Sequence, residues 1–170
     1  MSTPPPERRH VTFVCTGNIC RSPMAEGLLR HALRAHPEPL RSLPVRSAGT
    51  AAANGEPATP NALSALRSVG IDIGAHRSCP MTSALAATSL VIYVMTREHI
   101  YALRHLPAVP PLRLMLAPHL PPAAAITSTR EIDDPYGQNL SAYESCRDTM
   151  VAAIPALVTH IRDLLANATH

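Results

Sequence analysis

Apolar and polar positions along the chain form a pattern of short buried strands separated by helices. Continuous apolar runs with β-branched members predict parallel strands at residues 11–14, 44–48, 90–95 and 112–116. Between and after them, apolar residues recur at helical spacing over residues 22–35, 59–70, 97–105 and 139–167. This alternation favours an α/β fold, a single domain with a doubly wound, four-stranded parallel sheet and helices on both faces.

Proline and glycine residues mark several element boundaries. Ser22-Pro23 and Thr59-Pro60 each place a hydroxyl side chain before a proline, which predicts an N-cap followed by the first helical residue. Gly70 is expected to close the second helix as its C′ residue, and Pro155 is expected to kink the last helix. Residues 117–137 are expected to form a long loop, which is uncommon unless the loop is functional.

Composition narrows the classes of function. The 170 residues suffice for one hydrophobic core, with residues 1–9 as a disordered tail and residues 10–167 as the domain. A net charge of +3 does not argue for a nucleic-acid partner but is compatible with an anionic substrate. No stretch approaches the ~20 apolar residues of a membrane helix, so no membrane association is expected. Four cysteines without a secretory signal favour reduced thiols and a cytoplasmic location.

The stretch VCTGNICRS, residues 14–22, links the first strand to the first helix. Backbone amides and a helix dipole at such a junction can converge on one anion, and Gly17 and Asn18 most readily adopt unusual backbone angles there. The same environment favours the thiolate form of Cys15. Arg21 carries a planar guanidinium that matches two phosphate oxygens. Cys15 is therefore expected to attack a phosphoryl group that the loop holds.

Two other interpretations of Cys15 remain at this point. A free cysteine is often only a small buried hydrophobe. Cys15 and Cys20 could also form half of a zinc site, but no second pair follows at zinc-finger spacing, since Cys79 and Cys146 stand alone. No metal and no cofactor are expected.

A proton donor for the leaving group is expected in the segment IDDPYG, residues 132–137. Asp134 directly precedes a proline, which holds its backbone extended and can direct the carboxyl group from a loop into a cleft. The alternative is an ordinary Asp-Pro turn.

Together, VCTGNICRSPMAEG at residues 14–27 and DDPYG at residues 133–137 resemble signatures of the low-molecular-weight protein tyrosine phosphatase family of bacterial type. The resemblance spans residues 10–165 and implies the phosphotyrosine protein phosphatase I-like fold. It implies that Cys15 forms a phosphocysteine, that Arg21 binds the phosphoryl oxygens, and that Asp134 is the general acid and base. Asp134 is preferred over Asp133 because it adjoins the proline. The remaining implied roles are a phosphate-binding loop of Cys15, Thr16, Gly17, Asn18, Ile19, Cys20 and Arg21, and a Ser22 hydroxyl that stabilises the departing sulfur.

The same resemblance implies supporting residues and a substrate class. Asn18, Ser47 and His76 are expected to form a hydrogen-bond network that shapes the loop. Cys20 is expected to form a protective disulfide with Cys15 under oxidation. Tyr136 and Ile19 are expected to line the substrate cleft. The implied partner is a phosphorylated protein, and we expect a monomer.

The choice of substrate depends on few residues. Residues 51–54 lack the aromatic that many tyrosine-selective members carry, and residues 58–62 resemble the bacterial protein arginine phosphatases. Those enzymes typically have Thr where this chain has Ile19, and a branched hydrocarbon suits a phenyl ring. Phosphotyrosine is therefore favoured, with phosphoarginine as the alternative. A thiol-dependent arsenate reductase would need cysteines after residue 95 in a redox relay, and a phosphopeptide-binding module would be expected to lack Cys15 or Asp134.

Overall fold

The centre of the fold is a sheet of four strands that all run parallel. The strands are β1 (His10–Cys15), β2 (Val45–Gly49), β3 (Ser89–Val94) and β4 (Leu112–Leu114), in the spatial order β2-β1-β3-β4. The computed structural model describes residues 10–107 and 109–168, so the predicted disordered tail at residues 1–9 lies outside the described residues.

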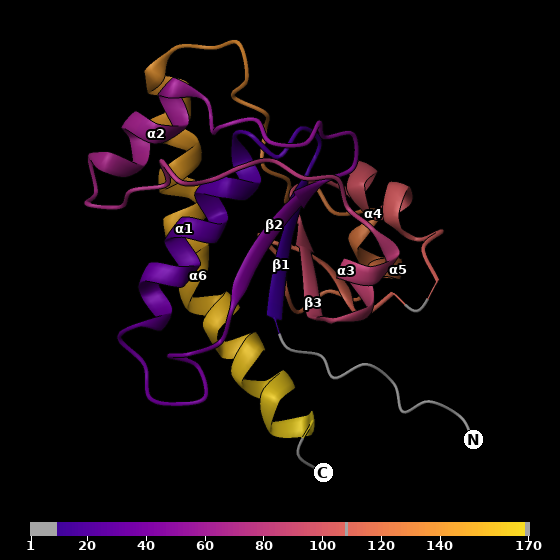
Figure 1. Ribbon diagram of the computed structural model, residues 1–170. Helices are drawn as coiled ribbons and strands as arrows, with labels where there is room; N and C mark the ends of the chain where they lie inside the picture. The colour runs from indigo at the N-terminus through magenta and orange to yellow at the C-terminus, as the bar shows by residue number, and fades with distance from the viewer. Residues whose placement is uncertain (1–9, 108, 169–170) are drawn as a thin grey trace.

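Helices cover both faces of the sheet (Figure 1). One face carries α1 (Arg21–Leu33), α2 (Pro60–Arg67) and α6 (Leu140–Ala168), and the other carries α3 (Ser83–Ala87), α4 (Arg97–Leu103) and α5 (Pro122–Ala125). Alternating side chains of β1 explain the two layers, because Phe13 packs into the first core and Val14 into the second. The predicted α/β architecture is therefore confirmed.

The strand order creates a reversal point beside β1. From β1 the chain moves outward to β2, and from β3 it moves in the opposite direction to β4. In open parallel sheets, the crevice at such a reversal is the usual ligand site, and it lies beyond the carboxyl ends of the strands. Cys15 is the last residue of β1 and therefore lies at this position.

Two predicted helix boundaries are confirmed and one is wrong. The Thr59 side chain accepts a hydrogen bond from the Ala62 amide, and Gly70 has a φ of 81° where the chain leaves α2. However, α1 begins at Arg21, so Ser22 is not its N-cap, and Cys20 at that position makes no side-chain capping bond. The physical reason is that the Ser22 hydroxyl contacts the Cys15 sulfur instead.

The segment predicted as one long loop contains an unpredicted helix. Residues 122–125 form α5, and α3 was also missed, because helices of four and five residues are too short to show a periodic pattern. Helix α6 continues through Pro155, and the predicted kink stays a prediction.

By length and composition, α6 is apolar enough to cross a membrane, contrary to the sequence-based expectation for the chain. One such helix is weak evidence, since the core helix of a soluble protein passes the same test. Here Met150, Leu157 and Ile161 of α6 are fully buried in the core shared with α1 and α2.

We predict that Gly49→Ala destabilises the protein by about 2 kcal/mol, because a rigid backbone contact leaves no room for a methyl group. A Cβ atom at Gly49 would lie 2.4 Å from the Thr16 carbonyl oxygen and 2.7 Å from the Ala52 Cβ. Urea unfolding of the parent and the variant measures the loss. Gly17→Ala is the matched control, since its nearest neighbour would be Ile19 Cγ1 at 3.6 Å, and equal stability of the two variants would contradict the argument.

Candidate active site

The loop between β1 and α1 leaves its backbone donors unpaired among the described residues, whereas five of its carbonyl groups accept hydrogen bonds. Within the described residues, no backbone or side-chain group accepts a hydrogen bond from the N–H groups of residues 16–21. The carbonyl oxygens, by contrast, are bound by groups outside this loop: Cys15 O by Thr50 N, Thr16 O by Ala51 N, Asn18 O by His76 Nε2, Ile19 O by Thr59 N and Cys20 O by Met24 N. Such a loop, at the N-terminus of a 13-residue helix, is suited to bind an anion.

Asn18 holds the sharp turn of this loop. Its φ of 57° lies in the left-handed region, which Asn tolerates better than most residues. The buried side chain donates from Nδ2 to Ser22 Oγ at 2.8 Å and to Ser47 Oγ at 3.0 Å, and its Oδ1 accepts from the Cys79 amide at 2.9 Å. Gly17, which was expected to share this role, does not have a positive φ.

Further polar groups contact the Asn18 backbone and the hydroxyl group to which its side chain donates. The His76 Nε2 donates to the Asn18 carbonyl oxygen at 2.7 Å, and the Ser47 hydroxyl donates to Glu26 Oε2 at 2.8 Å. His76 Nδ1 lies 3.8 Å from the same Glu26 oxygen. The structure therefore joins Asn18, Ser47 and His76 in one network, and it adds Glu26, which the sequence analysis missed.

The sulfur of Cys15 has one close polar partner. Ser22 Oγ lies 2.9 Å from Cys15 Sγ, and both residues are buried. Asn18 donates to the same hydroxyl oxygen, so the single Ser22 hydrogen can be donated either to the sulfur or to the Ala48 carbonyl oxygen, which is farther away at 3.4 Å. A hydroxyl hydrogen bond of this kind stabilises a thiolate.

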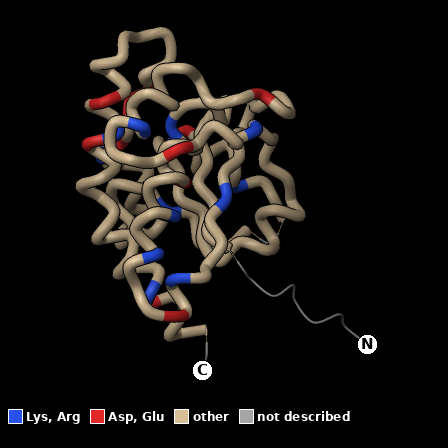
Figure 2. Tube along the Cα trace, turned by 60° about the vertical axis from the view of Figure 1, so that its left-hand side comes forward, with Lys and Arg blue, Asp and Glu red and all other residues tan. Residues whose placement is uncertain are grey.

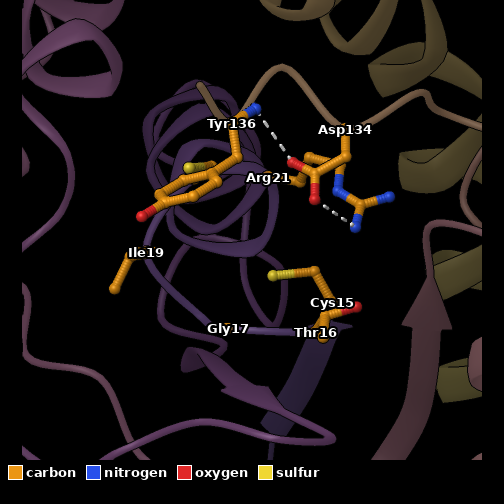
Figure 3. A pocket seen from close by; sticks show the side chains of 8 residues that line it. Cys15, Thr16, Gly17, Ile19, Arg21, Asp134 and Tyr136 are labelled. Carbon is orange, nitrogen blue, oxygen red and sulfur yellow. Dashed lines mark hydrogen bonds and ion pairs between the residues drawn. The ribbon is translucent and has the colours of Figure 1, made fainter. Parts of the chain in front are cut away.

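The mouth of the loop is a cavity of about 190 Å³, which is lined by residues from two segments of the chain. Arg21 Nη1 donates to the Ile132 carbonyl oxygen at 2.9 Å, and Nη2 lies 3.4 Å from Asp134 Oδ2. Figure 3 shows the Asp134 carboxylate meeting this guanidinium on the same side of the site as the Cys15 side chain. The lining residues are Cys15, Thr16, Gly17, Ile19, Cys20, Arg21, Asp134 and Tyr136.

The geometry separates the two adjacent carboxylates. Both aspartates line a surface hollow beside α6, but only Asp134 also lines the cavity that contains Cys15. Asp134 Oδ1 also accepts from the Tyr136 amide at 3.1 Å, which orders the turn that carries both side chains. Tyr136 is 64% exposed at the rim, and Ile19 lines the cavity with it (Figure 3).

Cys20 shares the cavity with Cys15, and both thiols are free. The Cys20 sulfur lies 3.3 Å from the Tyr143 hydroxyl and 3.6 Å from the Thr59 hydroxyl. Burial raises the pKa of the Cys20 thiol above its ordinary value, although these two hydrogen bonds oppose the shift. The thiol form therefore predominates at neutral pH, and the disulfide with Cys15 stays a prediction.

A buried histidine contacts the loop and was missed by the sequence analysis. His99 Nε2 lies 3.0 Å from Thr16 Oγ1, across 83 positions of sequence. Burial, followed by the charge of Arg21, lowers the pKa of His99 to about 4, and Asp134 opposes the shift. The sequence pattern that could have indicated His99 is Thr96-x-x-His99, which directly follows a strand and resembles a helix-capping box.

Charges elsewhere on the molecule are mixed in sign. Figure 2 shows acidic and basic residues interspersed along the trace, which fits the small net charge. Over residues 10–107 and 109–168, no group of three or more His, Cys, Asp or Glu side chains is arranged to hold a metal ion.

We predict that His99 makes the stability depend on pH between about 4 and 6.5. In this window the unfolded side chain binds a proton that the native one does not, so the free energy of unfolding falls as the pH decreases. Urea unfolding at about pH 4.5 and about pH 7 should show a smaller decrease in His99→Gln than in the parent. His10 and His160 also have lowered pKa values but contribute equally to both proteins, so identical slopes would contradict this assignment.

Comparison with known proteins agrees with this geometry. A family model described as "Low molecular weight phosphotyrosine protein phosphatase" matches residues 10–166. A probable low molecular weight protein-tyrosine-phosphatase, EpsP of Ralstonia solanacearum, is 34% identical over 159 residues and covers 91% of this chain and 97% of its own. The protein-arginine-phosphatase of Bacillus subtilis is 31% identical over 157 residues, covering 89% of this chain and 96% of its own.

Solved structures give the same result. The tyrosine phosphatase Wzb from Escherichia coli K30, in complex with sulphate, superimposes with a TM-score of 0.75 at 28% identity, covering 90% of this chain and 98% of that one. A Cys-to-Ser mutant of the YwlE arginine phosphatase, with a phosphorylated active site serine, gives a TM-score of 0.72 at 27% identity and covers 90% and 95%. The chain belongs to the low molecular weight phosphotyrosine protein phosphatase family.

Proposed function

We propose that this enzyme hydrolyses phosphotyrosine in a protein substrate through a phosphocysteine on Cys15. The observation that carries the proposal is the loop itself, in which Cys15 and Arg21 line one cavity and the backbone amides have no acceptors among the described residues. These donors match the equatorial oxygens of a phosphoryl group under attack. The phosphorylated serine in the arginine phosphatase mutant supports covalent transfer to the residue in the nucleophile position.

The proposed reaction has two steps. First, the Cys15 thiolate attacks phosphorus, the P–O bond to the tyrosyl oxygen breaks, and the Asp134 carboxyl group donates its proton to that oxygen. Second, the Asp134 carboxylate takes a proton from water, the oxygen of which attacks phosphorus and releases inorganic phosphate. The P–S bond breaks, and the Ser22 hydroxyl, 2.9 Å from the sulfur, stabilises the returning thiolate.

The walls of the cavity favour an aromatic leaving group. Ile19 and Tyr136 line the cavity beside the loop, and together they provide apolar surface on which a phenyl ring can pack. Residues 51–54 are not among the lining residues, in keeping with the absence of an aromatic there. Phosphoarginine is the second candidate because a protein-arginine-phosphatase is 31% identical to this chain. A monomeric state and a cytoplasmic location stay predictions from the sequence.

We predict that Asp134→Ala slows substrates with poor leaving groups most, because these substrates need the proton at the moment the P–O bond breaks. The loss of kcat should be about 10²-fold or more for phenyl phosphate and clearly smaller for p-nitrophenyl phosphate. Asp133→Ala is the matched control and should change neither rate by more than about twofold. Equal losses for both substrates in Asp134→Ala would argue against its role as the acid.

We predict a preference for phosphotyrosine over phosphoarginine in peptides of matched sequence, because Ile19 offers hydrocarbon and no hydroxyl to the leaving group. Phosphate release should therefore be faster from the phosphotyrosine peptide, and Ile19→Thr should shift the ratio of the two kcat/KM values toward phosphoarginine. Cys15→Ser is the blank and should release no phosphate with either peptide. An unchanged ratio in Ile19→Thr would show that Ile19 does not set the preference. A preference of the parent for phosphoarginine would contradict phosphotyrosine as the substrate.

A further inference from the structure

The first turn of α4 contacts both loops of the active site. On one side, His99 in this turn lies 3.0 Å from the Thr16 hydroxyl in the phosphate-binding loop. On the other side, the amide of Arg97, the first residue of α4, donates to Glu131 Oε2 at 2.7 Å. Glu131 lies three positions before Asp134. The first turn of α4 therefore contacts both the loop that follows Cys15 and the segment that carries Asp134.

The hydrogen bonds of His99 define which nitrogen carries the proton. The Thr96 amide can only donate, and it lies 3.2 Å from His99 Nδ1, so Nδ1 is the acceptor. In the neutral ring the hydrogen therefore lies on Nε2, which donates to Thr16 Oγ1. The residue is only 4% exposed, and its lowered pKa keeps the ring neutral at neutral pH. His99 can thus orient Thr16 without adding a charge beside Arg21 and Asp134.

The acid segment is held at two further points. The Ile132 amide donates to the carbonyl oxygen of Met95, which directly follows β3, at 2.9 Å. The Ile132 carbonyl oxygen accepts from Arg21 Nη1, also at 2.9 Å. Glu131 adds an ion pair, with its Oε1 3.7 Å from Arg97 Nε. The segment just before Asp134 is therefore tied to the end of β3, to α4 and to Arg21.

We propose that His99 is a positioning residue, which holds Thr16 and the phosphate-binding loop in register with the segment that carries Asp134. The inference rests on the proposed roles of Cys15 and Asp134. His99 is not among the residues that line the cavity, so it acts through Thr16 and not by touching the substrate. A misplacement of about 1 Å between reacting groups can cost about 10²-fold in rate, so a contact that sets this register affects catalysis.

The test compares His99→Phe with His99→Gln. Phenylalanine fills the space without a donor, whereas the Gln amide can still donate to Thr16. In His99→Phe we expect the inhibition constant of inorganic phosphate to rise about tenfold, the order expected for one lost buried hydrogen bond. We also expect kcat to fall more for phenyl phosphate than for p-nitrophenyl phosphate, because proton donation by Asp134 is misaligned. His99→Gln should recover most of the phosphate affinity.

Two further variants show whether the effect passes through Thr16. Thr16→Val removes the acceptor from the other end of the same bond, so it should raise the phosphate inhibition constant in the same direction. Adding His99→Phe to Thr16→Val should then cost less than it costs the parent. His105→Phe is the matched control, because His105 is exposed just beyond α4 and should leave both readouts within about twofold.

The outcomes separate this inference from the proposed function. If His99→Phe leaves phosphate affinity unchanged, or lowers kcat equally for both substrates, His99 has only a structural role and the inference is overturned. If His99→Phe does not fold, an unchanged phosphate inhibition constant in Thr16→Val overturns it in the same way. Failure of the proposed function would appear in proteins that keep His99, as full turnover by Cys15→Ser or as equal losses for both substrates in Asp134→Ala.

Discussion

The constraint on which the site depends is a row of backbone N–H groups, at residues 16–21, without acceptors among the described residues. Unpaired backbone donors are costly, so the loop would relax toward its own carbonyl oxygens if nothing prevented it. Groups from outside the loop prevent this relaxation because they bind the loop carbonyl oxygens. Thr59 N and His76 Nε2, for example, each donate to a carbonyl oxygen of the loop. That oxygen is then less available to accept a hydrogen bond from an amide of the same loop. We expect a bound anion to supply the missing acceptor.

The doubly wound fold makes this arrangement possible because it brings separate segments to one edge of the sheet. The strand order reverses beside β1, so a crevice forms at the end of that strand. The neighbouring strand β2 contributes Ser47, which accepts a hydrogen bond from Asn18, and Gly49, which packs closely against the Thr16 backbone. On the other side, the end of β3 holds the acid segment through Met95. The proposed nucleophile, its supporting network and the proposed acid thus come from connections that are distant in sequence and adjacent in space.

Phosphoryl chemistry and leaving-group choice rest on different parts of the site. In the proposed mechanism, backbone amides and Arg21 bind oxygens that every phosphomonoester and phosphoramidate shares, so the loop itself would not select the leaving group. Selection falls to the few side chains at the rim, Ile19 and Tyr136 among them. This division explains how relatives named tyrosine phosphatase and arginine phosphatase can both match nearly the whole chain at 34% and 31% identity.

The sequence by itself determined the strand that ends at Cys15, the cap at Thr59 and the turn at Gly70, because each depends on neighbouring residues and their backbone preferences. It also predicted that the loop after this strand binds an anion, and the family resemblance added the expected roles of Asp134 and of Asn18, Ser47 and His76. Only the tertiary structure decided that Ser22 contacts the Cys15 sulfur instead of capping α1, and that His99 meets Thr16 across 83 positions. The physical reason is that a side chain bonds the partner that the packed strands and helices bring within reach, and local preference does not contain that information.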